Sequence, residues 1–157
     1  MKYAERDAFE VVGIEIRTTN ADEVTPRGKI PGLWQRFFSD GVLDAIPHRK
    51  LGAPIVAVYS NYENGVHGAY SLLLGTEVTA IDRLPEGLVA RAVPKAKYAI
   101  FESNQGPTSQ VVPDVWKRIW NWGEGTRALA ADFEVYDERA RDPANARVDV
   151  FISVVGP

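Results

Sequence analysis

The stretch Ile30-Pro-Gly-Leu-Trp-Gln-Arg-Phe-Phe38 recurs at an offset of 82 residues, from 30 to 112, as Val112-Pro-Asp-Val-Trp-Lys-Arg-Ile-Trp120. In both copies apolar side chains occupy the first, fourth, fifth, eighth and ninth positions, which is the stripe of an amphipathic helix. Gly41 and Gly123 follow the two copies and are placed to end them. The sequence therefore predicts two related helices that each turn one side toward a core.

Strand-like segments flank each predicted helix in the same order, one before it and two after it: 9–18, 55–60 and 69–78 in the first half, and 98–102, 133–136 and 148–154 in the second. Residues 20–29 are polar and loop-like, and 79–97 is expected to connect the halves. The chain thus divides into two strand-helix-strand-strand units, about 9–78 and 98–154. We predict an α+β fold with pseudo-twofold symmetry, a mostly antiparallel sheet and two main helices.

The length of 157 residues suits one domain, 1–157. A formal charge of -3 gives no cationic field, so we expect no direct contact with nucleic acid. The chain has no cysteine, and its only histidines, His48 and His67, fall in predicted loops without a ligand spacing, so we expect neither a metal nor a cofactor. A polar N-terminus and the lack of a long apolar run indicate a cytoplasmic protein without a membrane segment.

The repeat breaks in the first strand after each helix. Val56-Ala57-Val58-Tyr59 aligns with Phe133-Glu134-Val135-Tyr136, so a carboxylate replaces a methyl group. Strand alternation places Glu134 on one face with Asp132 and Tyr136. The residues alone leave two interpretations open. Glu134 faces water or pairs with an arginine such as Arg91 or Arg147, or it forms the floor of an aromatic pocket that binds a cation.

Aromatic side chains that could line such a pocket are spread over both helices and several strands. Aromatic faces attract cations and stack on flat rings, although helically spaced aromatics are more often core residues. The residues predicted to form a ligand site with Glu134 are Trp34, Phe38, Tyr59, Tyr70, Trp116, Trp120, Tyr136 and Phe151.

Several segments resemble the GyrI-like small-molecule-binding domain, the effector-binding domain of bacterial multidrug-responsive transcription regulators. The segments that carry the resemblance span nearly the whole chain: Leu84-Pro-Glu-Gly-Leu88, Tyr98 to Glu102 with Gly106, Val115-Trp116 through Trp122, Asp132 to Tyr136 and Val148 to Val154. Each is weak alone, and their order carries the resemblance. It implies two pseudo-symmetric strand-helix-strand-strand units, and a buried glutamate, here Glu134, that receives lipophilic cations.

The resemblance implies a stand-alone member similar to drug-binding modules of mobile gene cassettes. No stretch reads as a DNA-binding helix-turn-helix, so a part in transcription regulation would need a partner protein that carries a DNA-binding domain. We favour a non-enzymatic binding module for lipophilic, cationic, aromatic molecules. Two alternatives stay open: a hydrolase of reactive electrophilic natural products that uses Glu134 with Tyr59 or Tyr136, and a protein-binding inhibitor of the gyrase-inhibitor type.

Overall fold

The computed structural model describes residues 2–123 and 126–156. Its eight strands form one antiparallel sheet in the order β1-β6-β8-β7-β3-β4-β2-β5. The strands are β1 (Lys2–Arg6), β2 (Phe9–Thr19), β3 (Ile55–Ser60), β4 (Ala69–Val78), β5 (Val89–Val93), β6 (Ala96–Glu102), β7 (Ala131–Tyr136) and β8 (Asp149–Ser153). The helices are α1 (Asn20–Glu23), α2 (Ile30–Ser39), α3 (Val42–Ala45) and α4 (Thr108–Trp122).

The strand order shows the predicted pseudo-twofold symmetry. Reading outward from the centre, β3, β4 and β2 on one side match β7, β8 and β6 on the other. The two central strands pair in antiparallel register, and Ala57 lies directly opposite Glu134. These two residues also correspond in the repeat, so the pseudo-axis passes between them. The predicted α+β fold with a mostly antiparallel sheet and two main helices is confirmed.

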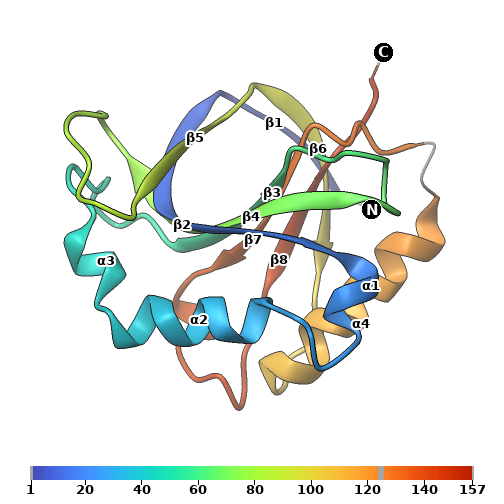
Figure 1. Ribbon diagram of the computed structural model, residues 1–157. Coiled ribbons are helices and arrows are strands. Elements are labelled where there is room, and N and C mark those ends of the chain that lie inside the picture. Colours follow the sequence, from blue (N-terminus) through green and yellow to red (C-terminus); the bar gives the residue numbers. More distant parts are fainter. Residues whose placement is uncertain (1, 124–125, 157) are drawn as a thin grey trace.

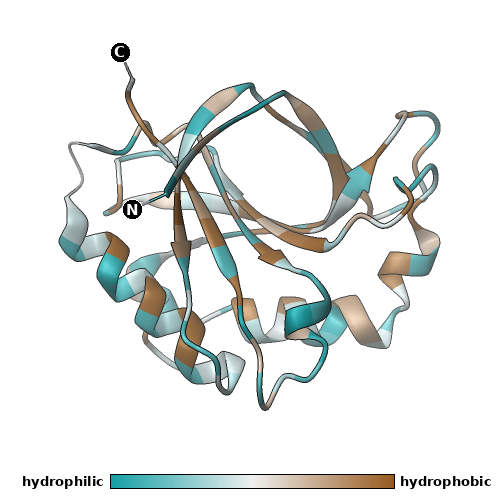
Figure 2. Ribbon diagram, turned by 180° about the vertical axis from the view of Figure 1, so that it is seen from behind, coloured by the Kyte–Doolittle hydropathy of each residue, from teal (hydrophilic) through white to brown (hydrophobic). Residues whose placement is uncertain are grey.

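The sheet curls so that its outer face carries both main helices, as Figure 1 shows. One cluster of buried residues lies between α2, α3 and the strands β2, β3 and β4. A separate cluster joins α4 to β6 and β8. A third cluster fills the concave face, where Phe133 stacks on Phe151 at 4.7 Å between ring centroids. In Figure 2, apolar residues accordingly gather on the strands and on the sheet-facing sides of the helices.

A glycine pair permits the sharp curl of the first half. Gly13 in β2 and Gly75 in β4 are direct cross-strand partners. A Cβ atom on Gly13 would lie 2.0 Å from the Leu74 carbonyl oxygen, and one on Gly75 would lie 2.0 Å from the Val12 carbonyl oxygen. No side chain fits such a close approach of two backbones, which is the position where glycine is required.

The structure corrects four expectations about local structure. Residues 79–97, expected as a connection, contain β5, and β1 adds a further edge strand that the pattern did not reveal. The short helix α1 interrupts the predicted loop at 20–29, and α4 begins at Thr108 instead of residue 112, with Pro113 inside it. Gly41 has the left-handed conformation expected of a helix end, whereas Gly123 has φ 120° and ψ 121°.

Strands β1 and β5 extend the symmetry because each adds to the opposite unit. Strand β1 precedes β2 in the chain but pairs with β6, and β5 precedes β6 but pairs with β2. Both are short edge strands with charged residues, so their apolar alternation is too weak to recognise in the sequence. The exchange ties the two units together at both edges of the sheet.

Candidate functional site

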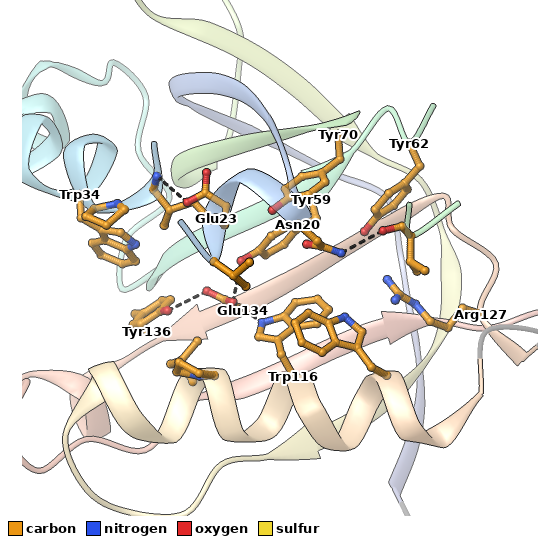
Figure 3. A pocket seen from close by; sticks show the side chains of 17 residues that line it. Asn20, Glu23, Trp34, Tyr59, Tyr62, Tyr70, Trp116, Arg127, Glu134 and Tyr136 are labelled. Carbon is orange, nitrogen blue, oxygen red and sulfur yellow. Dashed lines mark hydrogen bonds between the residues drawn. The ribbon is translucent and has the colours of Figure 1, made fainter. Parts of the chain in front are cut away.

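A cavity of about 320 Å³ opens on the outer face of the sheet, between α2 and α4 and above the central strands β3 and β7. Its size lies within the range of sites for small molecules, roughly 300 to 1,000 Å³. The lining is mainly apolar and aromatic, and it includes few charged groups (Figure 3). The cavity therefore lies on the pseudo-twofold axis, where the helices of the two units leave the centre of the sheet uncovered.

The walls consist of residues that the repeat relates in pairs. Trp34 of α2 packs edge-on against Tyr136 at 4.7 Å between ring centroids, and Trp116 of α4 packs against Tyr59 at 5.0 Å. Both contacts cross from one unit to the other, because each tryptophan meets the tyrosine of the opposite unit. Further corresponding pairs lining the cavity are Ile30 with Val112 and Pro31 with Pro113.

The carboxyl group of Glu134 lies in this cavity at the axis and accepts three hydrogen bonds. Tyr59 donates its hydroxyl to Oε2 at 2.8 Å, and Trp116 donates Nε1–H to the same oxygen at 2.6 Å. Tyr136 donates its hydroxyl to Oε1 at 2.7 Å. The two tyrosines are related by the pseudo-axis and approach the carboxyl group from opposite sides. Strand alternation and the aligned tyrosines thus bring one acid within reach of both units.

Glu134 is only 2% exposed, and this burial raises the pKa of its carboxyl group against the lowering effect of the three hydrogen bonds. Burial and the charge of Glu134 raise the pKa of Tyr59 and of Tyr136 well above the usual tyrosine range. Both hydroxyls therefore remain protonated donors. The donors stabilise the ionised carboxylate, and desolvation opposes it.

The water-facing interpretation of Glu134 is wrong, and so is its pairing with Arg91 or Arg147. Arg91 forms an ion pair with Glu15, with 2.5 Å between Nη2 and Oε1. Among the ion pairs of the described residues, none involves Glu134. The hydrogen-bond partners of its carboxyl group are thus the neutral donors of Tyr59, Trp116 and Tyr136.

A second carboxylate, Glu23 at the end of α1, also lines the cavity. Its oxygens accept the backbone N–H groups of Lys29, at 2.8 Å, and Ile30, at 3.0 Å, and the hydroxyl of Thr18. Lys29 is the N-cap of α2 and makes no side-chain capping bond, so Glu23 supplies the acceptor that this helix end lacks. Glu23 therefore orders the start of α2 and adds negative charge to the rim.

A buried ion pair between Arg127 and Asp132 closes the opposite end of the cavity. Arg127 Nη2 donates to Asp132 Oδ2 at 2.8 Å, and the two side chains are 3% and 0% exposed. Tyr62 donates its hydroxyl to the same Oδ2, and the backbone N–H and hydroxyl of Ser153 donate to Oδ1. Asp132 is thereby saturated with hydrogen bonds and pairs with a cation, in contrast to Glu134.

All of the predicted site residues except Phe38 and Phe151 line the cavity. Phe38 is 66% exposed and stacks on the outer side of Trp34, at 6.0 Å between ring centroids. Phe151 belongs to the concave face, because its neighbours in β8 alternate and its ring stacks on Phe133. The expected places of these two residues in the site are therefore corrected.

The polar lining residues that were not predicted from the sequence are Asn20, Glu23, Tyr62 and Arg127. They lie in or beside loops, where no periodicity indicates a facing side. A signal existed for Glu23 alone, since an acid shortly before a helix without a capping residue is a candidate cap. Among the residues that the structure describes, no group of three or more potential ligands could hold a metal ion, and no helix is long and apolar enough to cross a membrane.

Comparison with known proteins gives matches over almost the whole chain. The family model described as integron-associated effector binding protein matches residues 3–154. The putative transcriptional regulator protein YobU of Bacillus subtilis is 33% identical over 149 residues, which are 94% of this chain and 93% of that protein. The transcriptional regulator BrlR of Pseudomonas aeruginosa is 32% identical over 163 residues, covering 98% of this chain. That match covers 54% of BrlR, so the chain spans about half the length of that regulator.

Solved structures show the same fold. An integron cassette protein from the mobile metagenome of Vibrio cholerae has a TM-score of 0.78 at 32% identity, covering 98% of this chain and 95% of that one. SAV2435, whose structure was determined bound to tetraphenylphosphonium, has a TM-score of 0.80 at 20% identity, covering 99% of this chain and 93% of that one. The second likeness is one of fold.

Proposed function

The chain belongs to the family of integron-associated effector-binding proteins, and from this premise we propose that it binds lipophilic cations with aromatic rings in the cavity around Glu134. The observation that carries the proposal is the state of that carboxyl group. It is buried, it accepts three hydrogen bonds from neutral donors, and no ion pair among the described residues compensates its charge. A cationic ligand would supply the missing charge.

Two physical terms favour such a ligand over others. The attraction between a cation and an ionised carboxylate is stronger in a desolvated cavity than in water. The faces of Trp34 and Trp116 add a cation–π contribution of roughly 0.5 to 2 kcal/mol. The walls are aromatic and the charged groups are few, so the cavity places few geometric requirements on a ligand. We therefore expect several unrelated cations to bind.

The structure of SAV2435, a protein with this fold, was determined bound to tetraphenylphosphonium, a lipophilic cation with four aromatic rings. That precedent supports the choice of this cation as the first probe. The role of Glu134 in this chain rests on its own geometry.

The test is calorimetric titration of tetraphenylphosphonium into the parent protein and into Glu134→Gln. The amide can keep the local hydrogen bonds, because its oxygen can accept from Tyr59 and Trp116 and its nitrogen can donate to the Tyr136 hydroxyl. We expect Glu134→Gln to bind about 100-fold more weakly, or about 2.8 kcal/mol. Glu138→Gln removes the same charge from an exposed residue outside the cavity and should change the dissociation constant less than about twofold.

Equal binding by the parent and Glu134→Gln would contradict the charge role.

One observation also favours an enzymatic alternative, because Glu134 converges with Tyr59 and Tyr136 within hydrogen-bond distance. These groups could activate water toward a strained electrophile. Turnover of such a compound by the parent and its loss in Glu134→Gln would favour the hydrolase.

The link to transcription belongs to the same proposal. Both curated relatives named above are described as transcriptional regulators, and one of them is about twice as long as the matched region. We propose that a bound cation is sensed by a partner that carries a DNA-binding domain. Co-purification of a bacterial DNA-binding protein with the tagged chain, dependent on added tetraphenylphosphonium, would support this part; its absence would count against the partner and leave the proposed ligand binding unchanged.

A further inference from the structure

Tyr70 differs from the other three tyrosines of the cavity in what its hydroxyl does. Tyr59, Tyr62 and Tyr136 each donate their hydroxyl to a buried carboxylate. Tyr70 lines the same cavity and is 4% exposed, yet its hydroxyl forms no hydrogen bond with the residues that the structure describes. Among those residues, Arg127 Nε is the only fully buried side-chain polar atom without a partner, so the Tyr70 oxygen keeps accessible surface. Tyr70 thus presents an accessible hydroxyl to the cavity.

The sheet register places this hydroxyl beside Glu23. Tyr70 in β4 is the direct cross-strand partner of Thr18 in β2, and the Thr18 hydroxyl donates to Glu23. The Tyr70 ring packs against the rings of Tyr59 and Tyr62, at 5.5 and 6.3 Å between centroids. In Figure 3 its hydroxyl points toward the side of the cavity where Glu23 lies. The packed neighbours fix the ring, and with it the position of the hydroxyl.

The charges around this hydroxyl favour a hydrogen-bond donor on the ligand. Burial, and then the charges of Glu23 and Glu134, raise the pKa of Tyr70 above its usual range, so the hydroxyl stays protonated and lies in a negative field. A negative potential attracts the hydrogen of an N–H group and repels an oxygen lone pair. The ion pair of Arg127 and Asp132 adds no net charge at the far end of the cavity.

We propose that the Tyr70 hydroxyl oxygen accepts a hydrogen bond from an amino group on the ligand, so that aromatic cations carrying an amine on one ring bind more tightly than cations without one. This inference rests on the proposed binding of cations at Glu134. Tyr59 links the two positions, because its hydroxyl binds Glu134 and its ring packs against Tyr70. A ligand ring that lies along Tyr59 brings its charge toward Glu134 and its amine toward Tyr70.

The experiment compares phosphonium cations that differ in one substituent: (4-aminophenyl)triphenylphosphonium, (4-methylphenyl)triphenylphosphonium and (4-methoxyphenyl)triphenylphosphonium. Amino and methyl groups have nearly the same shape, but only the amine donates hydrogen bonds, and the methoxy group offers only an acceptor. In calorimetric titrations of the parent at pH 7, we expect the amino compound to bind about fivefold more tightly than the methyl compound, as for one hydrogen bond. The methoxy compound should show no such gain.

Tyr70→Phe removes the hydroxyl and keeps the ring, so the ratio of amino to methyl affinity should fall to about one or below. The variant should keep the stability of the parent, because the hydroxyl makes no hydrogen bond with the described residues, and urea denaturation checks this. Tyr98→Phe is the matched control. Tyr98 is buried in the cluster of the concave face, so the loss of its hydroxyl should leave the ratio at about five.

The outcomes separate the two proposals. A ratio of about one in the parent, with both cations bound, overturns the Tyr70 subsite and leaves the cation site standing. A ratio of about five that persists in Tyr70→Phe also overturns it, since another group must then accept the amine. An equal gain for the methoxy compound would mean that Tyr70 acts as a donor, which contradicts the proposed preference. Failure of the folded parent to bind any of these cations contradicts the proposed function and the subsite with it.

Discussion

The two halves of the molecule share one scaffold and differ at one position beside the axis that relates them. Ala57 in β3 and Glu134 in β7 face each other directly, and each follows the same pattern of strands and helix. Around them the halves supply matching walls, whereas only the second half places a carboxyl group at the axis. The repeat thus builds a symmetric aromatic cavity, and a single substitution makes its floor acidic.

The place of that substitution explains its effect. An acid far from the axis would be reached by the tyrosine of one unit alone. Glu134 lies beside the axis and accepts from Tyr59 of the first unit and from Tyr136 of the second. The first unit therefore stabilises the carboxylate that the second unit carries, and neither unit alone contains the site.

Ala57→Glu should have the largest effect on stability, because it removes the difference between the two halves. Ala57 is 1% exposed and stands opposite Glu134, so the new carboxylate would be buried beside a like charge with its tyrosine donors already used. We expect the free energy of unfolding at pH 7 to fall by about 3–5 kcal/mol, the cost of an uncompensated buried charge. Urea denaturation followed by tryptophan fluorescence measures it.

The double variant Ala57→Glu with Glu134→Ala moves the carboxylate across the axis. Tyr59 and Tyr136 still approach from both sides, and Trp34 takes the position that Trp116 has now, so most of the lost stability should return. A double variant no more stable than Ala57→Glu alone would show that the two positions are not equivalent.

The two tryptophans give the next largest contrast, because the repeat relates them and only one binds the acid. Trp116 donates Nε1–H to Glu134 at 2.6 Å, whereas Trp34 makes an edge contact with Tyr136 and no side-chain hydrogen bond among the described residues. Trp116→Phe should cost about 1.5–3 kcal/mol more in tetraphenylphosphonium binding than Trp34→Phe, the value of a hydrogen bond to a charged group. Calorimetry at pH 7 measures both. Equal losses would mean that the tryptophans act only by packing.

Most of the fold follows from the sequence because the two helices and six central strands obey strict periodicities. Strands 55–60 and 69–78 coincide with β3 and β4 residue for residue. The edge strands β1 and β5 were not predicted, because they pair with the opposite unit and because the five residues of each show no clear alternation. Which unit an edge strand joins depends on the curl of the sheet, which local sequence does not encode.

The site was harder to predict because burial depends on where elements cross. Alternation places Glu134 on the helix side, but Phe38 and Trp120 occupy corresponding positions in the two helices and only Trp120 lines the cavity. Pro31 lies in the first turn of α2, whereas Pro113 lies inside the longer α4, so the helices differ in how far they extend along the cavity. Arg127 and Tyr62 follow elements whose orientation no pattern indicates.

Measurements at different pH values test the difference between the halves through Glu134, which has no carboxyl counterpart in the first half. Burial raises the pKa of Glu134 in the folded state above that of the unfolded chain, about 4.3 for a free glutamate. The protonated acid therefore stabilises the fold fully below the unfolded pKa, and this contribution is lost as pH rises through the folded pKa. Relative to Glu134→Gln, the parent should lose up to about 1.4 kcal/mol of unfolding free energy per pH unit across that interval.

Cation binding should follow the opposite trend, because tetraphenylphosphonium needs the ionised carboxylate. Its affinity for the parent should rise with pH through the folded pKa of Glu134 and then level off, with proton release detectable in buffers of different ionisation enthalpy. Denaturation and calorimetry at a series of pH values, from the ordinary glutamate pKa upward, measure both trends. An affinity in the parent as flat with pH as in Glu134→Gln would contradict the assignment.

The smallest contrast should be the one between Tyr59→Phe and Tyr136→Phe. Each variant removes one hydroxyl that donates to Glu134, at 2.8 Å and 2.7 Å, and each leaves the tryptophan of the opposite unit in contact with the ring. Because the repeat relates the two tyrosines and each donates one hydrogen bond, their losses in tetraphenylphosphonium affinity should agree within about 0.5 kcal/mol, although each loss is about 1 kcal/mol or more. The double variant should lose more than the sum, since Trp116 alone would then hold the buried charge. Unequal losses in the two single variants would mean that the two halves differ in their tyrosines as well as at Glu134.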